Sequence, residues 1–237
     1  MLVLALDTAT DAVVAGLLAV PEAGASTVLA ERALPGARRH GEQLMPAVLE
    51  LCGVAGRRLS EVDAVVCGTG PGPFTGLRVG LVSAASVADA LGVPVYGVCS
   101  LDAVAAEAVA LGTTEPLLVV SDARRRELFW AAYDARGRRT AGPGVDAPAA
   151  LAERVVGLGV PRVAGPVAAA HVDALGLPEF PSPGAALAPT PYGLVAVAEA
   201  DLRAHRTPAP LEPYYLRRPD AVPPGARKKV TPRMLAR

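Results

Sequence analysis

The 237-residue chain is short of aromatic residues, cysteines and net charge, and each shortage excludes a class of protein. Because 23 basic residues offset 23 acidic ones, a uniformly basic nucleic-acid binder is excluded. Aromatic residues make up only 4% of the chain, too few for the stacking platforms of proteins that bind single-stranded nucleic acid. The three cysteines form no CxxC pair, which argues against a disulfide framework or a zinc site. We expect reduced, buried thiols at Cys52, Cys67 and Cys99.

Common catalytic motifs are also missing. The only lysines, Lys228 and Lys229, lie near the C-terminus, which excludes an SxxK nucleophile, and no GxSxG elbow is present. The histidines fall in different predicted elements and lack HxxxH or HExxH spacing; they are His40, His171 and His205. We therefore expect no metal site and no cofactor.

Apolar residues make up 51% of the chain, and their pattern predicts a mixed α/β protein. In residues 1–112 we expect one lobe that begins with a three-stranded meander, formed by two runs within 2–20 and a third at 27–34. Further strands are expected at 62–67 and 93–98. Helices are expected at 41–52, 74–91 and 101–111, with Gly92 ending the second of them.

A second, smaller lobe is expected over residues 113–206. Its predicted strands are 116–120 and 127–133, its predicted helices are 148–156, 168–175 and 191–204, and breaker-rich loops are expected at 141–144 and 176–184. The tail 207–237 is rich in proline and basic, and it is not expected to form a packed domain. The apolar N-terminus carries Asp7 and Asp11 without a basic leader, so it fits neither a signal peptide nor a membrane span. These features indicate a cytoplasmic protein.

The segment GTGPGPFTGLRVG, residues 68–80, places a glycine loop between a predicted strand and a predicted helix. Its backbone amides, including those of Gly70 and Gly72, could hold an anion at the helix N-terminus. It is neither a Walker loop, because no lysine follows, nor a dinucleotide motif, because Pro73 replaces the third glycine. The same residues also suit a tight strand-to-helix turn.

The helix after this loop carries a small residue at every fourth position: Gly76, Gly80, Ala84 and Ala88. Such a strip allows another helix to approach closely, and the helix at 41–52 is strongly apolar as well, so the two helices could form a docking surface. Packing within the chain is the alternative. A separate, partly polar stripe contains Arg78, Val82, Ser86 and Asp89.

Charged residues at predicted strand ends are the other candidates for chemistry. Asp7, next to Thr8, and Asp122 could each meet a magnesium-bound phosphate, although turn or cap roles suit them equally. The run 124–126 of three arginines could grip a phosphate or an acidic partner, or form a solvated loop.

Five segments together resemble the TsaB family, also called YeaZ. They are LALDTAT at 4–10, RHGEQLMP at 39–46, the glycine segment at 68–80, SDARRRELFWAAY at 121–133 and PYYLRRPDA at 213–221. The resemblance implies two tandem lobes of the actin, sugar kinase and Hsp70 type. It also implies a noncatalytic subunit of the machinery that makes N6-threonylcarbamoyladenosine at position 37 of tRNA.

The resemblance further implies docking on TsaD, the transferase subunit, with TsaE joining a larger complex and a homodimer forming when the chain is alone. TsaD carries an HxxxH metal pair, and Ser100 and Val104 stand at the corresponding positions here, so neither metal binding nor peptidase activity is expected. The residues expected at the docking surface lie on the two predicted helices: His40, Leu44, Met45, Val48, Gly76, Arg78, Gly80 and Ala84.

An alternative from another class is a nucleotide-dependent kinase or hydrolase that uses Asp7, Thr8 and the glycine loop. The missing lysine argues against it. Contact with tRNA is a third possibility, because residues 217–237 hold seven basic residues and Asp220, which leaves residues 1–216 with a net charge of −6. That tail could neutralise phosphates or act as a solubilising extension.

Overall fold

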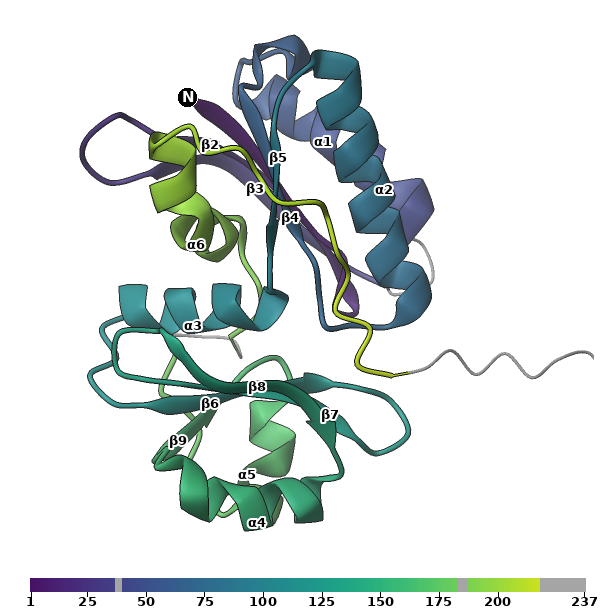
Figure 1. The fold of residues 1–237 in the computed structure, drawn as a ribbon. Helices are drawn as coiled ribbons and strands as arrows, with labels where there is room; N and C mark the ends of the chain where they lie inside the picture. Colours follow the sequence, from purple (N-terminus) through teal and green to yellow (C-terminus); the bar gives the residue numbers. More distant parts are fainter. Residues whose placement is uncertain (37–39, 183–186, 218–237) are drawn as a thin grey trace, which may run out of the picture.

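The computed structural model describes residues 1–36, 40–182 and 187–217. Two β-sheets are stacked with helices between and outside them (Figure 1). The chain completes all five strands of the first sheet and two of the helices that cover it before it enters the second sheet.

The first sheet has the strand order β3-β2-β1-β4-β5, in which the first three strands form the predicted antiparallel meander and the last two add in parallel. Its strands are β1 (Leu2–Asp7), β2 (Ala12–Ala19), β3 (Thr27–Pro35), β4 (Ala64–Gly68) and β5 (Val95–Val98). Helices α1 (His40–Val54) and α2 (Phe74–Leu91) cover one face, and α6 (Pro191–Arg203) packs on the other.

Helix α2 ends at Gly92, as predicted, because the glycine adopts the left-handed conformation with a φ of 68°. The helix has the length and composition of one that crosses a membrane. Its buried side, which includes Leu77 and Leu81, instead packs in the core of the first sheet.

The second sheet has the order β8-β7-β6-β9. Its strands are β6 (Leu117–Asp122), β7 (Leu128–Tyr133), β8 (Arg139–Asp146) and β9 (Arg162–Ala164). Helix α3 (Ser100–Ala110) covers the face toward the first sheet, while α4 (Pro148–Leu158) and α5 (Val172–Leu175) cover the far face. Short 3₁₀ turns lie at Leu59–Glu61 and Ala168–His171.

The expected loop at 141–144 is wrong, because these residues lie within strand β8. Strand β8 is an edge strand, where a proline removes no ladder hydrogen bond that the sheet needs. Gly144 lies against the ring of Trp130, where a Cβ would come within 2.8 Å of the indole. Glycine and proline therefore serve close packing here, and β9 escaped prediction because it is only three residues long.

The helix expected at 191–204 forms, but it packs on the first sheet and not within the expected second lobe of residues 113–206. The cause is the apolar side of α6, where Leu194 and Ala198 share a buried cluster with Val3 of β1. Helix α6 also approaches α3 closely, since a Cβ on Gly193 would come within 2.3 Å of the Ala103 carbonyl oxygen. The helix expected at 168–175 is a 3₁₀ turn followed by one helical turn. The expected boundary between the two lobes at residue 112 stays a prediction.

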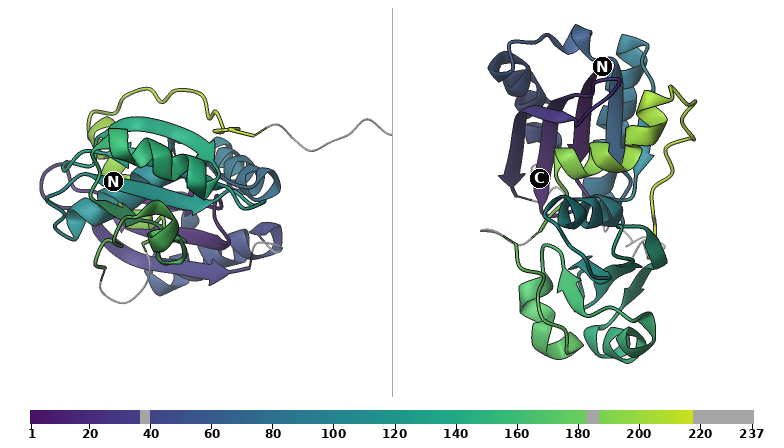
Figure 2. Two further views of the ribbon diagram at one scale, coloured as in Figure 1. Left: turned by 90° about the horizontal axis from the view of Figure 1, so that it is seen from below. Right: turned by 90° about the vertical axis from the view of Figure 1, so that its left-hand side faces the viewer.

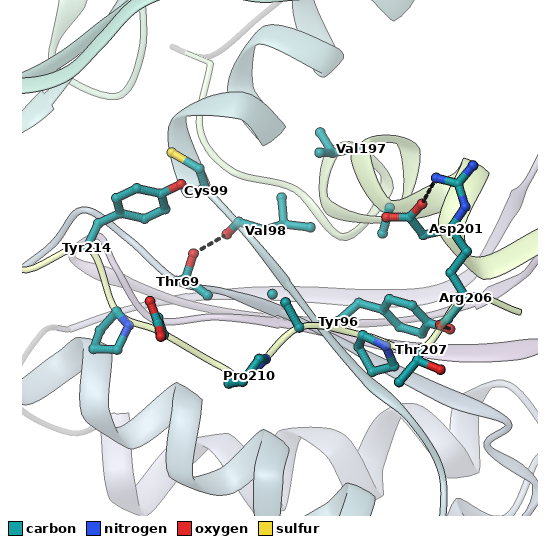
Figure 3. Close-up of a pocket in the computed structure, with 16 residues that line it drawn as sticks. Thr69, Tyr96, Val98, Cys99, Val197, Asp201, Arg206, Thr207, Pro210 and Tyr214 are labelled. Carbon is teal, nitrogen blue, oxygen red and sulfur yellow. Dashed lines mark hydrogen bonds and ion pairs between the residues drawn. The ribbon is translucent and has the colours of Figure 1, made fainter.

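After α6 the chain returns as an extended segment, residues 204–217, which we call the C-terminal strap. Figure 1 shows it crossing the first sheet and running beside α2 toward the start of that helix, and Figure 2 shows it on the outside of the molecule. Beneath it lies a cavity of about 580 Å³ whose wall includes Tyr96, Val98 and Pro210 (Figure 3). The charged residues Asp201 and Arg206 at its rim pair with each other.

Candidate functional site

The polar residues that follow β1 are buried inside the first lobe. Asp7 has no exposed surface, and its carboxylate accepts hydrogen bonds from the Ser100 hydroxyl at 2.5 Å and from the Ala9 amide at 2.8 Å. Burial raises the pKa of Asp7 to about 6, against the lowering effect of these two donors. Because it is enclosed, Asp7 has no surface with which to meet a bound phosphate in this conformation.

Thr8 fixes helix α2 to the end of β1. Its hydroxyl donates to the Gly76 carbonyl at 2.7 Å and accepts from the Gly80 amide at 3.0 Å. A Cβ on Gly80 would come within 2.4 Å of the same hydroxyl oxygen. Thr8 is 1% exposed, so it serves helix packing and is not presented to a ligand.

The glycine loop is likewise filled by the chain itself. A Cβ on Gly68 would lie 1.8 Å from the Asp7 carboxylate, and one on Gly72 would lie 2.3 Å from the Ala9 carbonyl oxygen. The Gly70 amide donates to the Ser100 hydroxyl at 3.2 Å, and Gly70 has a φ of 88°. These contacts favour the tight-turn interpretation, since the glycines at 68 and 72 are required by close approach.

The strip of small residues on α2 packs within the chain. Gly76, Gly80, Ala84 and Ala88 are all buried against the first sheet, so the alternative of internal packing is correct for them. Leu44 and Val48 of α1 are 1% and 0% exposed and lie in the same core, and Met45 is half-buried against it. The side chain of His40 lies outside the described part of the structure.

The solvent-facing surface of α1 and α2 is mixed, and it exposes other apolar residues beside polar and charged ones. Leu49 and Val54 of α1 are 59% and 68% exposed, and Val82 of α2 is 64% exposed. We call Leu49, Val54 and Val82 the outer face. Among the described side chains that were expected at a docking surface, only that of Arg78 is exposed on this side. The sequence signal that could have found it is the partly polar stripe that contains Arg78 and Val82, because this stripe faces solvent.

The arginine run lies in the turn between β6 and β7. Asp122 accepts from the Arg124 amide at 2.7 Å, which is the turn role, and Arg124 forms ion pairs with both Asp122 and Asp11. Residues 124–126 all have positive φ values, between 54° and 63°. Through Asp11 the turn connects the second sheet to the first.

The two residues at the positions of the TsaD histidines are both interior. Ser100 is 2% exposed and bonded to Asp7, and Val104 lies in the core between α3 and the second sheet. Within residues 1–36, 40–182 and 187–217, no three His, Cys, Asp or Glu side chains come together as they would around a metal ion. The cysteines in this part of the chain are free and buried, as expected.

Comparison with known proteins places this architecture. The family model for TsaD, tRNA N6-adenosine threonylcarbamoyltransferase, matches residues 28–199. A solved structure of YeaZ from Pseudomonas aeruginosa superposes with a TM-score of 0.70 at 29% identity, over 91% of this chain and 99% of that one. A second structure from the same organism, similar to the YeaZ peptidase, gives a TM-score of 0.71 with the same coverage.

Sequence comparison finds relatives that include named TsaB proteins. An uncharacterised protein of Mycobacterium tuberculosis is 48% identical over 223 residues, which is 93% of this chain and 94% of that protein. The tRNA threonylcarbamoyladenosine biosynthesis protein TsaB of Haemophilus influenzae is 35% identical, over 54% of this chain and 51% of its own. TsaB of Escherichia coli is 32% identical, over 56% of this chain and 55% of its own.

The two mixed sheets, with helices between and outside them, define a protein of the actin and sugar kinase-like fold class. Asp7 at the end of β1 and Ser100 just after β5 are buried and hydrogen-bonded to each other. The chain belongs to the TsaD-like family and, within it, to the TsaB/YeaZ branch.

Proposed function

We propose that this chain is a noncatalytic docking subunit in the synthesis of N6-threonylcarbamoyladenosine in tRNA, and that its outer face binds a TsaD protein. The named TsaB relatives support the pathway, since they are described as tRNA threonylcarbamoyladenosine biosynthesis proteins. We further propose that the complex recruits TsaE, that the chain forms a homodimer when alone, and that it acts in the cytoplasm.

The observation that carries the proposal is the contrast between the two sides of α1 and α2. The inner side packs against the chain itself, since Gly76 and Gly80 of α2 both contact the Thr8 hydroxyl at the end of β1. The outer side leaves Leu49, Val54 and Val82 more than half exposed. Exposed apolar surface on neighbouring helices is typical of a protein interface, because removing it from water favours association.

The alternative, a nucleotide-dependent kinase or hydrolase, requires the polar groups near Asp7 to open. Ser100 donates to the Asp7 carboxylate, and a Cβ on Gly68 would collide with it, so an incoming phosphate would have to displace both the bond and the loop. Calorimetric titration of the isolated chain with ATP and magnesium separates the two proposals. Tight binding with turnover would favour the enzyme.

The docking proposal is tested with the TsaD of the same organism. We expect the two proteins to co-purify, and threonylcarbamoyl transfer to tRNA to require this chain. The double variant Leu49→Asp with Val82→Asp should weaken binding on the order of 100-fold, because it buries two carboxylates in an apolar contact.

The matched control is Val156→Asp, since Val156 is 88% exposed on α4 at the far end of the second lobe. This variant should bind as the native chain does. Equal binding by the double variant would contradict docking through the outer face.

The basic end of the tail, residues 217–237, is proposed to contact tRNA phosphates, and all of it except Arg217 lies outside the described residues. Deleting residues 222–237 removes five basic residues. The deletion should weaken tRNA binding by the assembled complex and make the remaining affinity less dependent on salt. If the affinity of the complex for tRNA is unchanged by the deletion, residues 222–237 do not contact tRNA and act as a solubilising extension.

A further inference from the structure

The C-terminal strap is held at defined points along its path. The Tyr96 hydroxyl donates to the Arg206 carbonyl at 2.9 Å, and the Tyr214 amide donates to the Thr69 carbonyl at 2.9 Å. At its end, the Arg217 guanidinium donates to the Ala123 carbonyl at 2.9 Å and pairs with Glu127. The strap is therefore fixed to both lobes, and whatever it presents to solvent has a defined position.

What it presents is Tyr215. The Tyr215 ring lies 5.0 Å from the ring of Phe74 at the start of α2, and the Tyr215 hydroxyl accepts a 3.0 Å hydrogen bond from Arg78 Nε. The Arg78 guanidinium lies over the Phe74 ring at 3.9 Å. We call Phe74, Arg78 and Tyr215 the aromatic corner. Phe74 and Tyr215 are 37% and 41% exposed, so the corner is ordered by its own contacts and still accessible.

The aromatic corner continues the outer face. Phe74, Arg78 and Val82 are spaced four residues apart on α2 and therefore lie along one side of the helix. Aromatic side chains and arginine are the residue types that contribute most to binding at protein interfaces. In a chain with only nine Phe, Tyr and Trp residues, two of them are half exposed at this corner.

The charge of Arg78 indicates what kind of partner surface the aromatic corner would bind. Arg78 bonds to Tyr215 and lies over two rings, but it has no carboxylate partner in the described part of the chain. A guanidinium at the rim of an apolar surface favours a partner that brings a carboxylate to it, since such pairs give orientation and specificity. The matching surface is thus an apolar one with an acidic side chain at one end.

We infer that the strap, through Tyr215, forms one end of the docking surface, and that Arg78 there receives an acidic side chain of the TsaD partner. This inference rests on the proposed function. It adds to the helices α1 and α2 a contact from a segment that is more than 120 residues away in sequence. Preordering by the strap lowers the entropy that the corner loses on binding.

The test is calorimetric titration of the full chain with the TsaD of the same organism. Tyr215→Ala and Arg78→Gln are each expected to weaken binding about tenfold or more, and Arg78→Gln should also reduce the salt dependence of the affinity. Arg58→Gln is the control, because the Arg58 side chain is 83% exposed in a turn and pairs with Glu61. It should bind within about twofold of the native chain.

Tyr215→Phe keeps the ring and removes only the hydroxyl that Arg78 contacts, so it carries the test if Tyr215→Ala proves unstable in a thermal melt. It should weaken binding severalfold. If the Tyr215 variants bind normally while Leu49→Asp with Val82→Asp does not, the inference fails and the proposed function stands. If the double variant also binds normally, the outer face itself is wrong. If Tyr215→Ala weakens only self-association, the corner belongs to a second copy and the inference is overturned.

Discussion

At the scale of single residues, Asp7 couples stability to pH. Burial raises the pKa of Asp7 in the folded chain to about 6, from its ordinary value of 3.8. The folded state therefore holds a proton that the unfolded state has lost between about pH 4 and pH 6. Stability from this group is fully present below pH 4 and is lost as the pH rises through 6.

The variant Asp7→Asn removes this effect, because the amide stays neutral at every pH. We expect its free energy of unfolding to exceed that of the native chain by about 1–3 kcal/mol at pH 7, since two pKa units correspond to about 2.7 kcal/mol. At pH 4 the two proteins should differ little. Chemical denaturation at both pH values measures the difference, and an equal gain at pH 4 would contradict the titration of Asp7.

Gly80 sets the distance between α2 and β1. In Gly80→Ala the new methyl group would lie 2.4 Å from the Thr8 hydroxyl, which is already bonded on two sides. We expect a loss of about 1–3 kcal/mol of stability from this overpacking. Gly53→Ala is the matched control, because Gly53 lies in α1 with nothing within 4 Å. It should stabilise the chain by about 0.5–1 kcal/mol, and a gain at both sites in urea denaturation would refute the close approach.

At the scale of elements, the start of α6 is capped by Thr190. The Thr190 hydroxyl accepts from the Gly193 amide at 2.9 Å and donates to the Glu107 carboxylate of α3 at 2.6 Å. Thr190→Ala should therefore cost about 1–2 kcal/mol, and Thr190→Ser should restore most of it. Thermal unfolding of both variants measures this, and equal melting temperatures would show that the cap contributes nothing.

Elements with strong periodicity could be predicted from the sequence. Helix α2 begins and ends where expected, because its apolar residues recur at helical spacing and Gly92 stops it. Strand β8 could not be predicted from the sequence, because Gly142, Pro143 and Gly144 are typical of a loop. They fit a strand only because this strand lies at a sheet edge and packs against Trp130.

The candidate site was predictable only in outline. Small residues four apart fit close helix packing against either a partner or the chain's own sheet, and local sequence does not distinguish the two. The contact of Thr8 with Gly76 and Gly80 shows that these small residues pack within the chain. That contact joins residues about 70 positions apart in sequence. The role of Tyr215 could not be predicted for the same reason, because the residues it contacts on α2 are more than 130 positions away in sequence.

At the scale of the whole molecule, the strap joins the two lobes. Leu211 packs with the core beneath α1 and α2, whereas Tyr214 and Leu216 pack with the core between α3 and the second sheet. Arg217 adds polar contacts to the β6–β7 turn, and Arg124 of that turn pairs with Asp11 of the first lobe. The two sheets are therefore held together in part by a segment that has no regular secondary structure.

Truncation separates the strap from the rest of the tail. A chain ending at Arg217 keeps all three apolar anchors and should melt within a few degrees of the full chain. A chain ending at Arg206 loses Leu211, Tyr214 and Leu216, which at about 1–2 kcal/mol for each partly buried side chain amounts to roughly 3–6 kcal/mol. For a chain of this length that corresponds to a fall in melting temperature on the order of 10 °C. Calorimetric melting of both truncated chains measures it; if the shorter one keeps the native melting temperature, the strap does not hold the lobes together.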